Sequence, residues 1–267
     1  MRTHPFLVIN PRSGSDSPSA GELADAAREA GIEAHLLRQG EDPGEVARAS
    51  GASALGMAGG DGSLATVAQV ALDTGVAFAC IPFGTRNHFA GDVGLDRGDP
   101  LGALAVFADG VERLVDVGRV NDRLFLNNVS LGVYAGLVHR REHHRRRSDA
   151  FARARALSQV ARHRHRLHVQ VKGEPMRARA ILIGNNRYEL DLLTLGARAR
   201  LDEGVLQLRT ADGLLPTSWE ERVEPRFRIE VPGGRLRAAI DGEPVVLDSP
   251  LELESVPQAL RVLVPSP

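Results

Sequence analysis

The segment "GGDGS" at residues 59–63 places one carboxylate, Asp61, among three glycines directly after an apolar run. Glycine lets the backbone approach a bulky anion, and the amides at the start of a following helix are donors that suit phosphate. A carboxylate repels bare phosphate, so Asp61 makes sense there if Mg²⁺ or a protonated hydroxyl group lies between it and the phosphate oxygens. The segment therefore indicates a site for phosphate chemistry.

Two other loops combine glycine with polar residues: "NPRSGS" at residues 10–15 and "PFGTRNHFAG" at residues 82–91. Each follows an apolar run that we predict to be a strand. Ligands of open parallel sheets bind beyond the carboxyl ends of the strands, where all three loops would lie. A single glycine-rich turn is weak evidence, since "GGDG" is neither the dinucleotide fingerprint nor the P-loop. The three loops together carry the prediction.

The elements that must position these loops alternate between strand and helix over residues 1–118, which indicates a parallel sheet with helices on both faces. Helix starts are marked by Ser19, which forms a capping box with Glu22, by Asp42 and by Ser63. The predicted strands are residues 6–10, 33–37, 53–59, 76–82 and 111–117, and the predicted helices are residues 19–31, 42–50, 63–75 and 99–110.

The pattern changes near Gly118. Short alternating runs separated by Gly, Pro and Asp fill residues 119–267, which predicts an antiparallel β-sandwich with one helix at residues 149–162. We predict a hairpin turn at "VPGGRL", residues 231–236. The fold class is therefore an α/β domain, residues 1–118, followed by an all-β domain, residues 119–267.

Composition excludes several classes of protein. Of the 267 residues 43% are hydrophobic and the net charge is −1, so the chain can bury a core and has no overall field for a polyanion. The single cysteine, Cys80, excludes an internal disulfide, and its apolar neighbours predict burial. Aromatic residues make up 4%, too few for stacking nucleic-acid bases. We expect neither redox chemistry nor a nucleic-acid partner.

No apolar run approaches the roughly 20 residues of a membrane-spanning helix, and the first ten residues lack a signal-peptide pattern, so we expect a cytoplasmic protein.

Residues 139–168 hold ten arginines and six of the nine histidines. The arginines would repel a metal ion, which disfavours metal binding by these histidines. The segment is a solvated basic face or a docking surface for anionic lipid headgroups; a nucleic-acid site is a weaker third option.

The set "NPRSG", "GGDGS" and "PFGTRN" resembles the catalytic domain of the diacylglycerol kinase family, which includes bacterial lipid kinases and the sphingosine and ceramide kinases. The resemblance extends through "VDVGRVNDRLFLNNVSLGVYA", "LDEGVLQL" and "IDGEPV". It implies an ATP-binding domain, a lipid-substrate domain, and Mg²⁺-dependent transfer of the γ-phosphoryl group of ATP to a lipid hydroxyl such as that of diacylglycerol. It also implies peripheral association with an anionic membrane surface, and a homodimer remains an option.

By this resemblance, Asp61 and Asp116 would belong to the Mg²⁺ network, and Glu243 with Asp241 would act on the lipid hydroxyl. The residues implied to hold ATP are Asn10, Gly14, Gly59, Gly60, Asp61, Gly62, Ser63, Leu64, Ala65, Thr85 and Asn87. A second, structural metal site in the β-rich domain would use Glu203 and the backbone oxygens of Arg200 and Val205. Glutamate stands there instead of the usual aspartate, which leaves Mg²⁺, Ca²⁺ and no metal open.

Four positions of the α/β domain depart from the family pattern. His88 follows Asn87 where relatives commonly have an acid, and Ala65 and Thr66 replace an Asn-Glu pair. Ser63 replaces a threonine but keeps its hydroxyl group. An imidazole does not replace a carboxylate in a hydrated Mg²⁺ network. Two alternatives therefore stay open: an enzyme similar to NAD kinase, which shares the Gly-Gly-Asp-Gly loop, and a catalytically weakened regulator that binds nucleotide or lipid.

Overall fold

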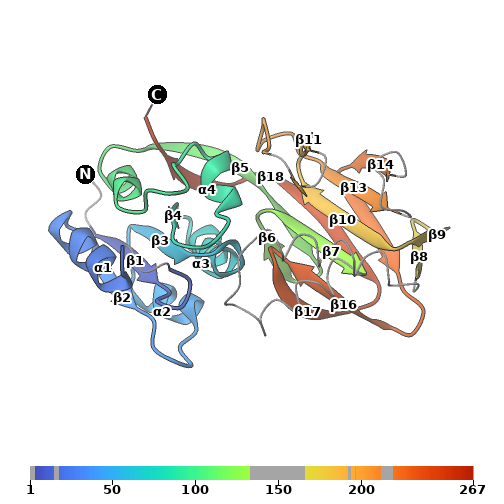
Figure 1. Ribbon diagram of the computed structural model, residues 1–267, viewed down its shortest axis with the longest axis horizontal. Helices are drawn as coiled ribbons and strands as arrows, with labels where there is room; N and C mark the ends of the chain where they lie inside the picture. The colour runs from blue at the N-terminus through green and yellow to red at the C-terminus, as the bar shows by residue number, and fades with distance from the viewer. Residues whose placement is uncertain are drawn as a thin grey trace. The chain divides into compact units, whose positions relative to one another are not determined.

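The computed structural model describes residues 4–14, 18–132, 166–191, 194–195, 197–211 and 219–266 (Figure 1). The chain divides into two compact units. Unit 1 contains Met1–Val117, Ala197–Asp202 and Pro257–Pro267. Unit 2 contains Gly118–Gly196 and Glu203–Val256. Unit 1 thus includes two short segments from the part of the sequence that we assigned to the all-β domain.

Unit 1 is built on a parallel sheet with the strand order β2-β1-β3-β4. The strands are β1 (Pro5–Ile9), β2 (Glu33–Leu36), β3 (Ala54–Gly59) and β4 (Ala77–Pro82). The three strands β1, β3 and β4 are buried along their whole length, as continuous apolar runs in a sheet covered on both faces predict. The chain leaves β1 toward β2 and leaves β3 toward β4, in opposite directions along the sheet. The topological switch point therefore lies between β1 and β3.

The helices of unit 1 begin and end largely where the sequence predicts. They are α1 (Ala20–Glu29), α2 (Pro43–Ala49), α3 (Asp61–Thr74), α4 (His88–Asp92) and the 3₁₀ helix η1 (Gly102–Phe107). Ser19 and Glu22 form the predicted capping box at α1, and the Asp42 side chain caps α2. Gly75 ends α3 in the left-handed conformation, with φ 71°. These local signals fix the helix ends because each satisfies backbone groups that the helix leaves unpaired.

Three predictions in unit 1 are wrong. Gly60, and not Ser63, is the N-cap of α3, and the Ser63 hydroxyl donates a hydrogen bond to the Gly60 carbonyl at 2.9 Å instead of accepting an amide. Gly60 takes the extended conformation that an N-cap requires (φ −78°, ψ 167°), so the N-cap lies three residues earlier than predicted. The segment predicted as a helix at residues 99–110 contains a 3₁₀ helix instead, and α4 lies inside a segment that we predicted to be a loop.

Unit 2 is a β-sandwich, as predicted. One antiparallel sheet has the order β14-β13-β10-β7-β16-β17, and the second contains β9-β8-β15 with the first part of β18. One cluster of buried side chains unites both sheets, with Val169 and Phe227 from the second and Leu206 and Ile240 from the first. Two strands, β5 (Val111–Val120) and β18 (Leu251–Val264), belong to both units, because their residues 111–117 and 257–264 are part of unit 1. The other strands of unit 2 are β6 (Arg123–Phe125), β7 (Asn128–Gly132), β8 (Leu167–Val171), β9 (Glu174–Ala178), β10 (Ala180–Asn185), β11 (Leu190–Asp191), β12 (Thr194–Leu195), β13 (Leu206–Ala211), β14 (Trp219–Glu224), β15 (Arg226–Glu230), β16 (Arg235–Ile240) and β17 (Glu243–Asp248).

The predicted hairpin at residues 231–236 is wrong. Gly233 and Gly234 do form a tight turn with φ 92° and 74°. The strands that it joins, β15 and β16, lie in different sheets, because β15 pairs with β18 and β8 while β16 pairs with β17 and β7. The turn therefore carries the chain from one layer of the sandwich to the other, and local sequence does not distinguish these two uses of a glycine turn.

Two predicted features fall outside the described residues. The helix at residues 149–162 does so entirely, and only residues 166–168 of the basic segment are described. Within the described part of the chain, no helix combines the length and the apolar character needed to cross a membrane.

Candidate active site

The three glycine loops of the sequence follow β1, β3 and β4, and these strands are parallel, so the loops share one edge of the sheet. Two contacts join the third loop to the other two. A Cβ atom on Gly14 would lie 2.3 Å from the Phe83 ring, and a Cβ atom on Gly84 would lie 2.5 Å from the Gly60 Cα atom. Such distances are too short for any side chain, so the glycines allow the loops to pack at backbone distance. The sequence prediction that these loops meet is consistent with this packing.

The loop after β1 is held by Asn10. The Asn10 amide donates to the Ala58 carbonyl of β3 at 2.9 Å, and its side-chain oxygen accepts the Arg12 amide at 3.0 Å. The Ser13 amide donates to the Asn10 carbonyl at 3.0 Å. The turn thus directs Gly14 toward Phe83. Asn10 fixes the loop at the switch point, which is where α/β sheets bind ligands.

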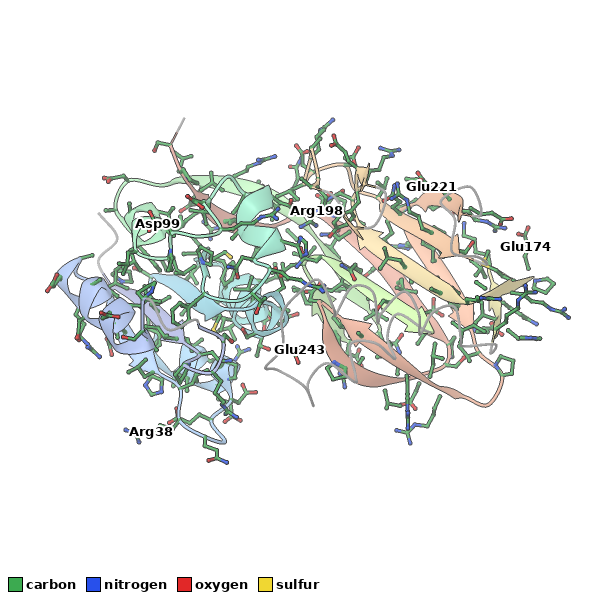
Figure 2. All side chains as sticks on the ribbon, in the orientation of Figure 1. Arg38, Asp99, Glu174, Arg198, Glu221 and Glu243 are labelled. Carbon is green, nitrogen blue, oxygen red and sulfur yellow. The ribbon has the colours of Figure 1, made fainter. Side chains whose placement is uncertain are left out.

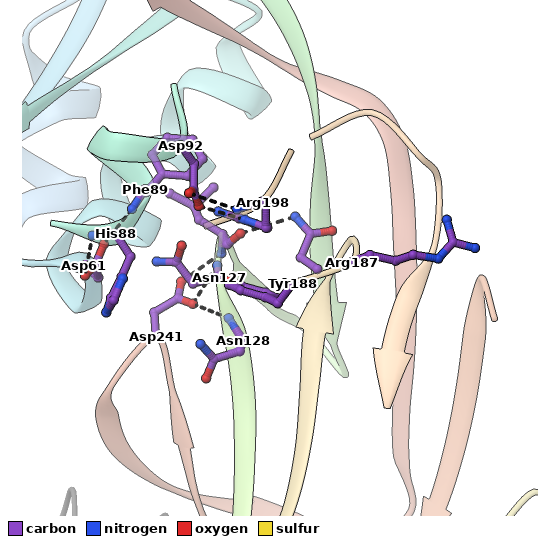
Figure 3. A network of polar contacts seen from close by, with 12 residues as sticks. Asp61, His88, Phe89, Asp92, Asn127, Asn128, Arg187, Tyr188, Arg198 and Asp241 are labelled. Carbon is purple, nitrogen blue, oxygen red and sulfur yellow. Dashed lines mark hydrogen bonds and ion pairs between the residues drawn. The ribbon is translucent and has the colours of Figure 1, made fainter. Parts of the chain in front are cut away.

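Asp61 joins the second loop to the third. It is the first residue of α3, but its carboxylate accepts the amides of His88 at 3.2 Å and Phe89 at 3.1 Å, at the start of α4 (Figure 3). The helix N-cap of α4, Asn87, has φ 48° and makes no cap bond with its own side chain. Asp61 therefore caps a neighbouring helix, a role that the sequence did not indicate.

No side chain caps α3 itself. The first amides of an α-helix have no carbonyl partner within the helix, and the N-terminus carries a partial positive charge. Of the predicted nucleotide residues, Gly62 and Ser63 lie in this first turn and are half-buried, Leu64 is buried, and Ala65 follows the turn. The Ser63 amide donates to the Gly60 carbonyl at 3.0 Å. A 14-residue helix that begins in a glycine turn is suited to bind phosphate.

Asn87 and Thr85 lie in the loop after β4. The Asn87 side chain accepts the Gly84 amide and donates to the Gly84 carbonyl, both at 2.9 Å, so it closes this loop on itself. Asn87 is buried and Thr85 is exposed. Thr85 is thus the one of the two whose side chain faces solvent, and Asn87 shapes the loop.

His88 is half-buried beside Asp61. Burial lowers the pKa of the imidazole and the Arg86 and Arg97 guanidinium groups lower it further, while the Asp61 carboxylate opposes them. The lowered pKa favours the neutral imidazole, so His88 adds no full positive charge next to Asp61 at neutral pH.

Cys80 is buried, as predicted. Burial raises the pKa of its thiol, with a smaller contribution from the Asp61 carboxylate.

Asp116 is buried on β5. Its amide donates to the Leu201 carbonyl and its carboxylate accepts the Gln258 amide, both at 2.7 Å. These contacts tie the two late segments of unit 1 to the rest of the unit. A Mg²⁺ ion shared by Asp61 and Asp116 stays a prediction, and the described residues contain no cluster of three or more His, Cys, Asp or Glu side chains suited to a metal.

The sequence missed a buried ion pair in unit 1. The Arg198 Nε atom donates to the Asp92 carboxylate at 2.8 Å, and both side chains are at most 1% exposed. The guanidinium carbon lies 6.0 Å from the centre of the Phe89 ring (Figure 3). Asp92 ends α4 and Phe89 lies within it, so Arg198 holds the helix that Asp61 caps. Among 33 basic residues, nothing in the sequence distinguishes Arg198.

In unit 2 the turn "IDGE" is a two-residue hairpin between β16 and β17, in which Asp241 (φ 48°) and Gly242 (φ 86°) both have positive φ. The Asp241 carboxylate is buried and accepts the amides of Leu126, Asn127 and Asn128 at 2.7–2.9 Å. Glu243, labelled in Figure 2, is the first residue of β17 and is exposed. Asp241 anchors the turn, and Glu243 is the more accessible of the two carboxylates.

The residues predicted for a second metal are divided between the two units. Glu203 and Val205 belong to unit 2, whereas Arg200 belongs to unit 1, where its guanidinium donates to Asp202 at 3.0 Å. Both carboxylate oxygens of Glu203 accept hydrogen bonds from Arg187. This arrangement does not fit a metal site at Glu203.

Comparison with known proteins gives relatives over the whole chain. The family model described as "Diacylglycerol kinase catalytic domain" matches residues 4–120. A protein of Pseudomonas aeruginosa PAO1 named "Probable lipid kinase YegS-like" is 31% identical over 298 residues, covering 98% of this chain and 94% of the relative. A protein of Klebsiella pneumoniae 342 with the same name is 26% identical, covering 99% of this chain and 98% of the relative.

Solved structures agree on the fold. The crystal structure of a diacylglycerol kinase from Bacillus anthracis str. Sterne superimposes with a TM-score of 0.71, at 16% sequence identity, and covers 98% of this chain and 97% of that chain. At this identity the likeness establishes the architecture alone, an α/β unit followed by a β-sandwich.

Proposed function

Because the chain belongs to the diacylglycerol kinase catalytic-domain family, we propose that it transfers the γ-phosphoryl group of ATP to a hydroxyl group of a lipid, with Mg²⁺. The observation that carries this proposal is the packing of three glycine loops at the switch point of the unit 1 sheet, at distances that only glycine allows. A site lined by backbone amides and a helix N-terminus suits a polyphosphate.

The loops at residues 10–14, 59–63 and 82–87 would bind the phosphates of ATP, with the α3 N-terminus compensating part of their charge. Mg²⁺ would neutralise charge on the transferring phosphoryl group, and Asp61 and Asp116 are the residues proposed to hold it. Asp61 also accepts the amides of His88 and Phe89, so it would hold the metal in addition to capping α4. Carboxylate oxygens are ligands that Mg²⁺ takes in proteins, so the two aspartates fit the metal in kind.

We assign the general base to Glu243. The lipid hydroxyl oxygen would form a bond to the γ-phosphorus while its proton passes to the Glu243 carboxylate, and ADP would leave with the electrons of the broken P–O bond. Asp241 would position Glu243, because its own carboxylate already accepts three backbone amides. Unit 2 would thus bind the lipid.

We further propose that the lipid is diacylglycerol, that the protein acts in the cytoplasm at an anionic membrane surface, and that it can form a homodimer. The basic segment at residues 140–166 is the part of the chain that we propose for membrane docking, since each arginine near an anionic surface contributes about 1 kcal/mol.

Incubation with γ-labelled ATP and a total lipid extract, with and without Mg²⁺, tests the proposal. We expect a labelled, chloroform-soluble product that requires the metal and is lost in Glu243→Gln. Label transferred to NAD would favour an enzyme similar to NAD kinase. Binding of ATP without transfer would favour a regulator, the alternative suggested by His88, Ala65 and Thr66.

A further inference from the structure

An ion pair in unit 2 occupies the position where the family resemblance implied a second metal. The Arg187 amide donates to one carboxylate oxygen of Glu203 at 3.0 Å, and the Arg187 Nη1 atom donates to the other oxygen at 2.6 Å. The Glu203 side chain is 16% exposed and the Arg187 side chain 52% exposed. One residue therefore supplies both donors to a carboxylate that is largely shielded from water.

The backbone around this pair is fixed by Asn186. Its side-chain oxygen accepts the Glu203 amide at 3.1 Å, and its own amide donates to the Val205 carbonyl at 2.9 Å. Asn186 is fully buried and has φ 66°, so it forms a left-handed turn that presents Arg187 to Glu203. The Val205 carbonyl, predicted to bind a metal, accepts this hydrogen bond. Four hydrogen bonds thus join residues 186–187 to residues 203–205.

These contacts compete with a divalent cation. Mg²⁺ requires oxygen ligands at about 2.1 Å in octahedral geometry, and Ca²⁺ requires six to eight oxygens at about 2.3–2.6 Å. A guanidinium group is a permanent cation with N–H donors and no acceptor, so it satisfies a carboxylate but repels a metal. A metal ion at Glu203 would have to displace the Arg187 side chain.

We propose that the Arg187 guanidinium takes the place of a divalent cation at Glu203, so that the turn at residues 203–205 is held without metal. This inference concerns a structural element of unit 2 and does not depend on the proposed phosphoryl transfer. The charge that a bound ion would supply comes from the chain itself.

Thermal unfolding of the nucleotide-free protein, followed by circular dichroism in EDTA, MgCl₂ or CaCl₂, tests the proposal. We expect the parent protein to unfold at the same temperature in all three conditions. We expect Arg187→Ala to unfold at a lower temperature in EDTA and to regain part of the loss in Mg²⁺ or Ca²⁺, because the Glu203 oxygens are released. Addition of Glu203→Gln to Arg187→Ala should abolish the response to metal.

Two controls define the result. Arg187→Lys keeps the charge and should remain insensitive to metal. Arg222→Ala removes an exposed partner of Glu174 in the same unit, at 2.9 Å, and should gain no response. A metal-dependent rise in the parent protein that persists in Asp61→Asn and disappears in Glu203→Gln would overturn the proposal. Failure of folded Arg187→Ala to respond to either cation would also overturn it.

Discussion

Two Asp-Gly dipeptides, Asp61–Gly62 in unit 1 and Asp241–Gly242 in unit 2, serve their turns differently. Asp61 begins helix α3, whereas Asp241 and Gly242 close a hairpin with positive φ at both residues. In each turn the carboxylate accepts amides from a segment distant in sequence: two at residues 88–89 and three at residues 126–128. Both aspartates therefore tie a turn to another loop.

Burial separates their roles. Asp241 is 6% exposed and accepts three backbone amides, so it anchors the β16–β17 turn to residues 126–128. Asp61 is half-buried and accepts two amides from α4. The loops next to it pack so closely that a side chain at Gly84 would not fit against Gly60. The two carboxylates therefore differ in access to solvent, since Asp61 is half-buried and Asp241 is buried. In unit 2 the accessible carboxylate is the neighbouring Glu243.

Glu243→Gln should give the largest effect. Loss of a general base lowers turnover by about 10² to 10⁴, and the affinity for ATP should stay unchanged because we place the proposed nucleotide site in unit 1. Turnover with labelled ATP and calorimetric ATP binding measure the two effects. Asp248→Asn, an exposed acid at the other end of β17, is the control and should retain turnover. Near-normal turnover in Glu243→Gln would remove the base role from Glu243.

Asp241→Ala should destabilise the protein by on the order of 3 kcal/mol, because it leaves three backbone donors without their acceptor. Asp241→Asn keeps one acceptor oxygen and should lose less. Urea unfolding measures both. Asp248→Ala, which breaks an exposed pair with Arg235, should change stability by less than about 0.5 kcal/mol. Equal unfolding midpoints for Asp241→Ala and Asp248→Ala would contradict the anchor role.

Gly84→Ala should cost about 1 to 3 kcal/mol of stability, because its Cβ atom would lie 2.5 Å from Gly60 and force the two loops apart. ATP affinity should fall with it. Gly98→Ala is the matched control, since its Cβ atom meets only an Asp96 oxygen at 3.5 Å. Thermal unfolding and ATP titration of both variants measure the two effects. Equal stability and equal ATP affinity of the two variants would contradict a role for the contact between Gly84 and Gly60.

Asp61→Asn should lose about 1 kcal/mol of stability, the usual cost of a weakened helix cap, while phosphoryl transfer is abolished. The single amide oxygen of asparagine can retain one of the two bonds to α4, and the negative charge proposed to hold Mg²⁺ is gone. Urea unfolding and the lipid assay separate the two effects. A folded Asp61→Asn enzyme with normal transfer would show that the residue serves only as a cap.

Gly60→Ala should have the smallest effect on stability, about 0.5 to 1 kcal/mol, because alanine is a poorer N-cap than glycine while its Cβ atom would meet nothing within 4 Å and the φ of −78° suits any residue. ATP affinity should nevertheless fall if phosphate approaches the backbone there, as we propose. Unchanged affinity in a titration would mean that the nucleotide lies elsewhere.

Local sequence determined the strands β1, β3 and β4 and the helices α1 and α2 of unit 1, but neither the start of α3 nor α4. The buried strands β1, β3 and β4 are continuous apolar runs, and the Ser19–Glu22 capping box is complete within four residues. Parallel pairing then brings the three loops to one edge of the sheet, as the order of strands and helices predicts. The individual nucleotide residues were implied by the family resemblance and stay a prediction. The antiparallel strands of unit 2 followed from alternation in the same way.

Contacts between residues distant in sequence were decided only by the tertiary structure. Asp61 caps α4 from 27 residues away, Asp241 binds amides 113 to 115 residues away, and Arg198 pairs with Asp92 across 106 residues. The same holds for Arg187 at Glu203, and for the turn that joins two sheets instead of two paired strands. Propensity and capping depend on near neighbours, whereas the partner of a buried charge depends on which segments the folded chain brings together.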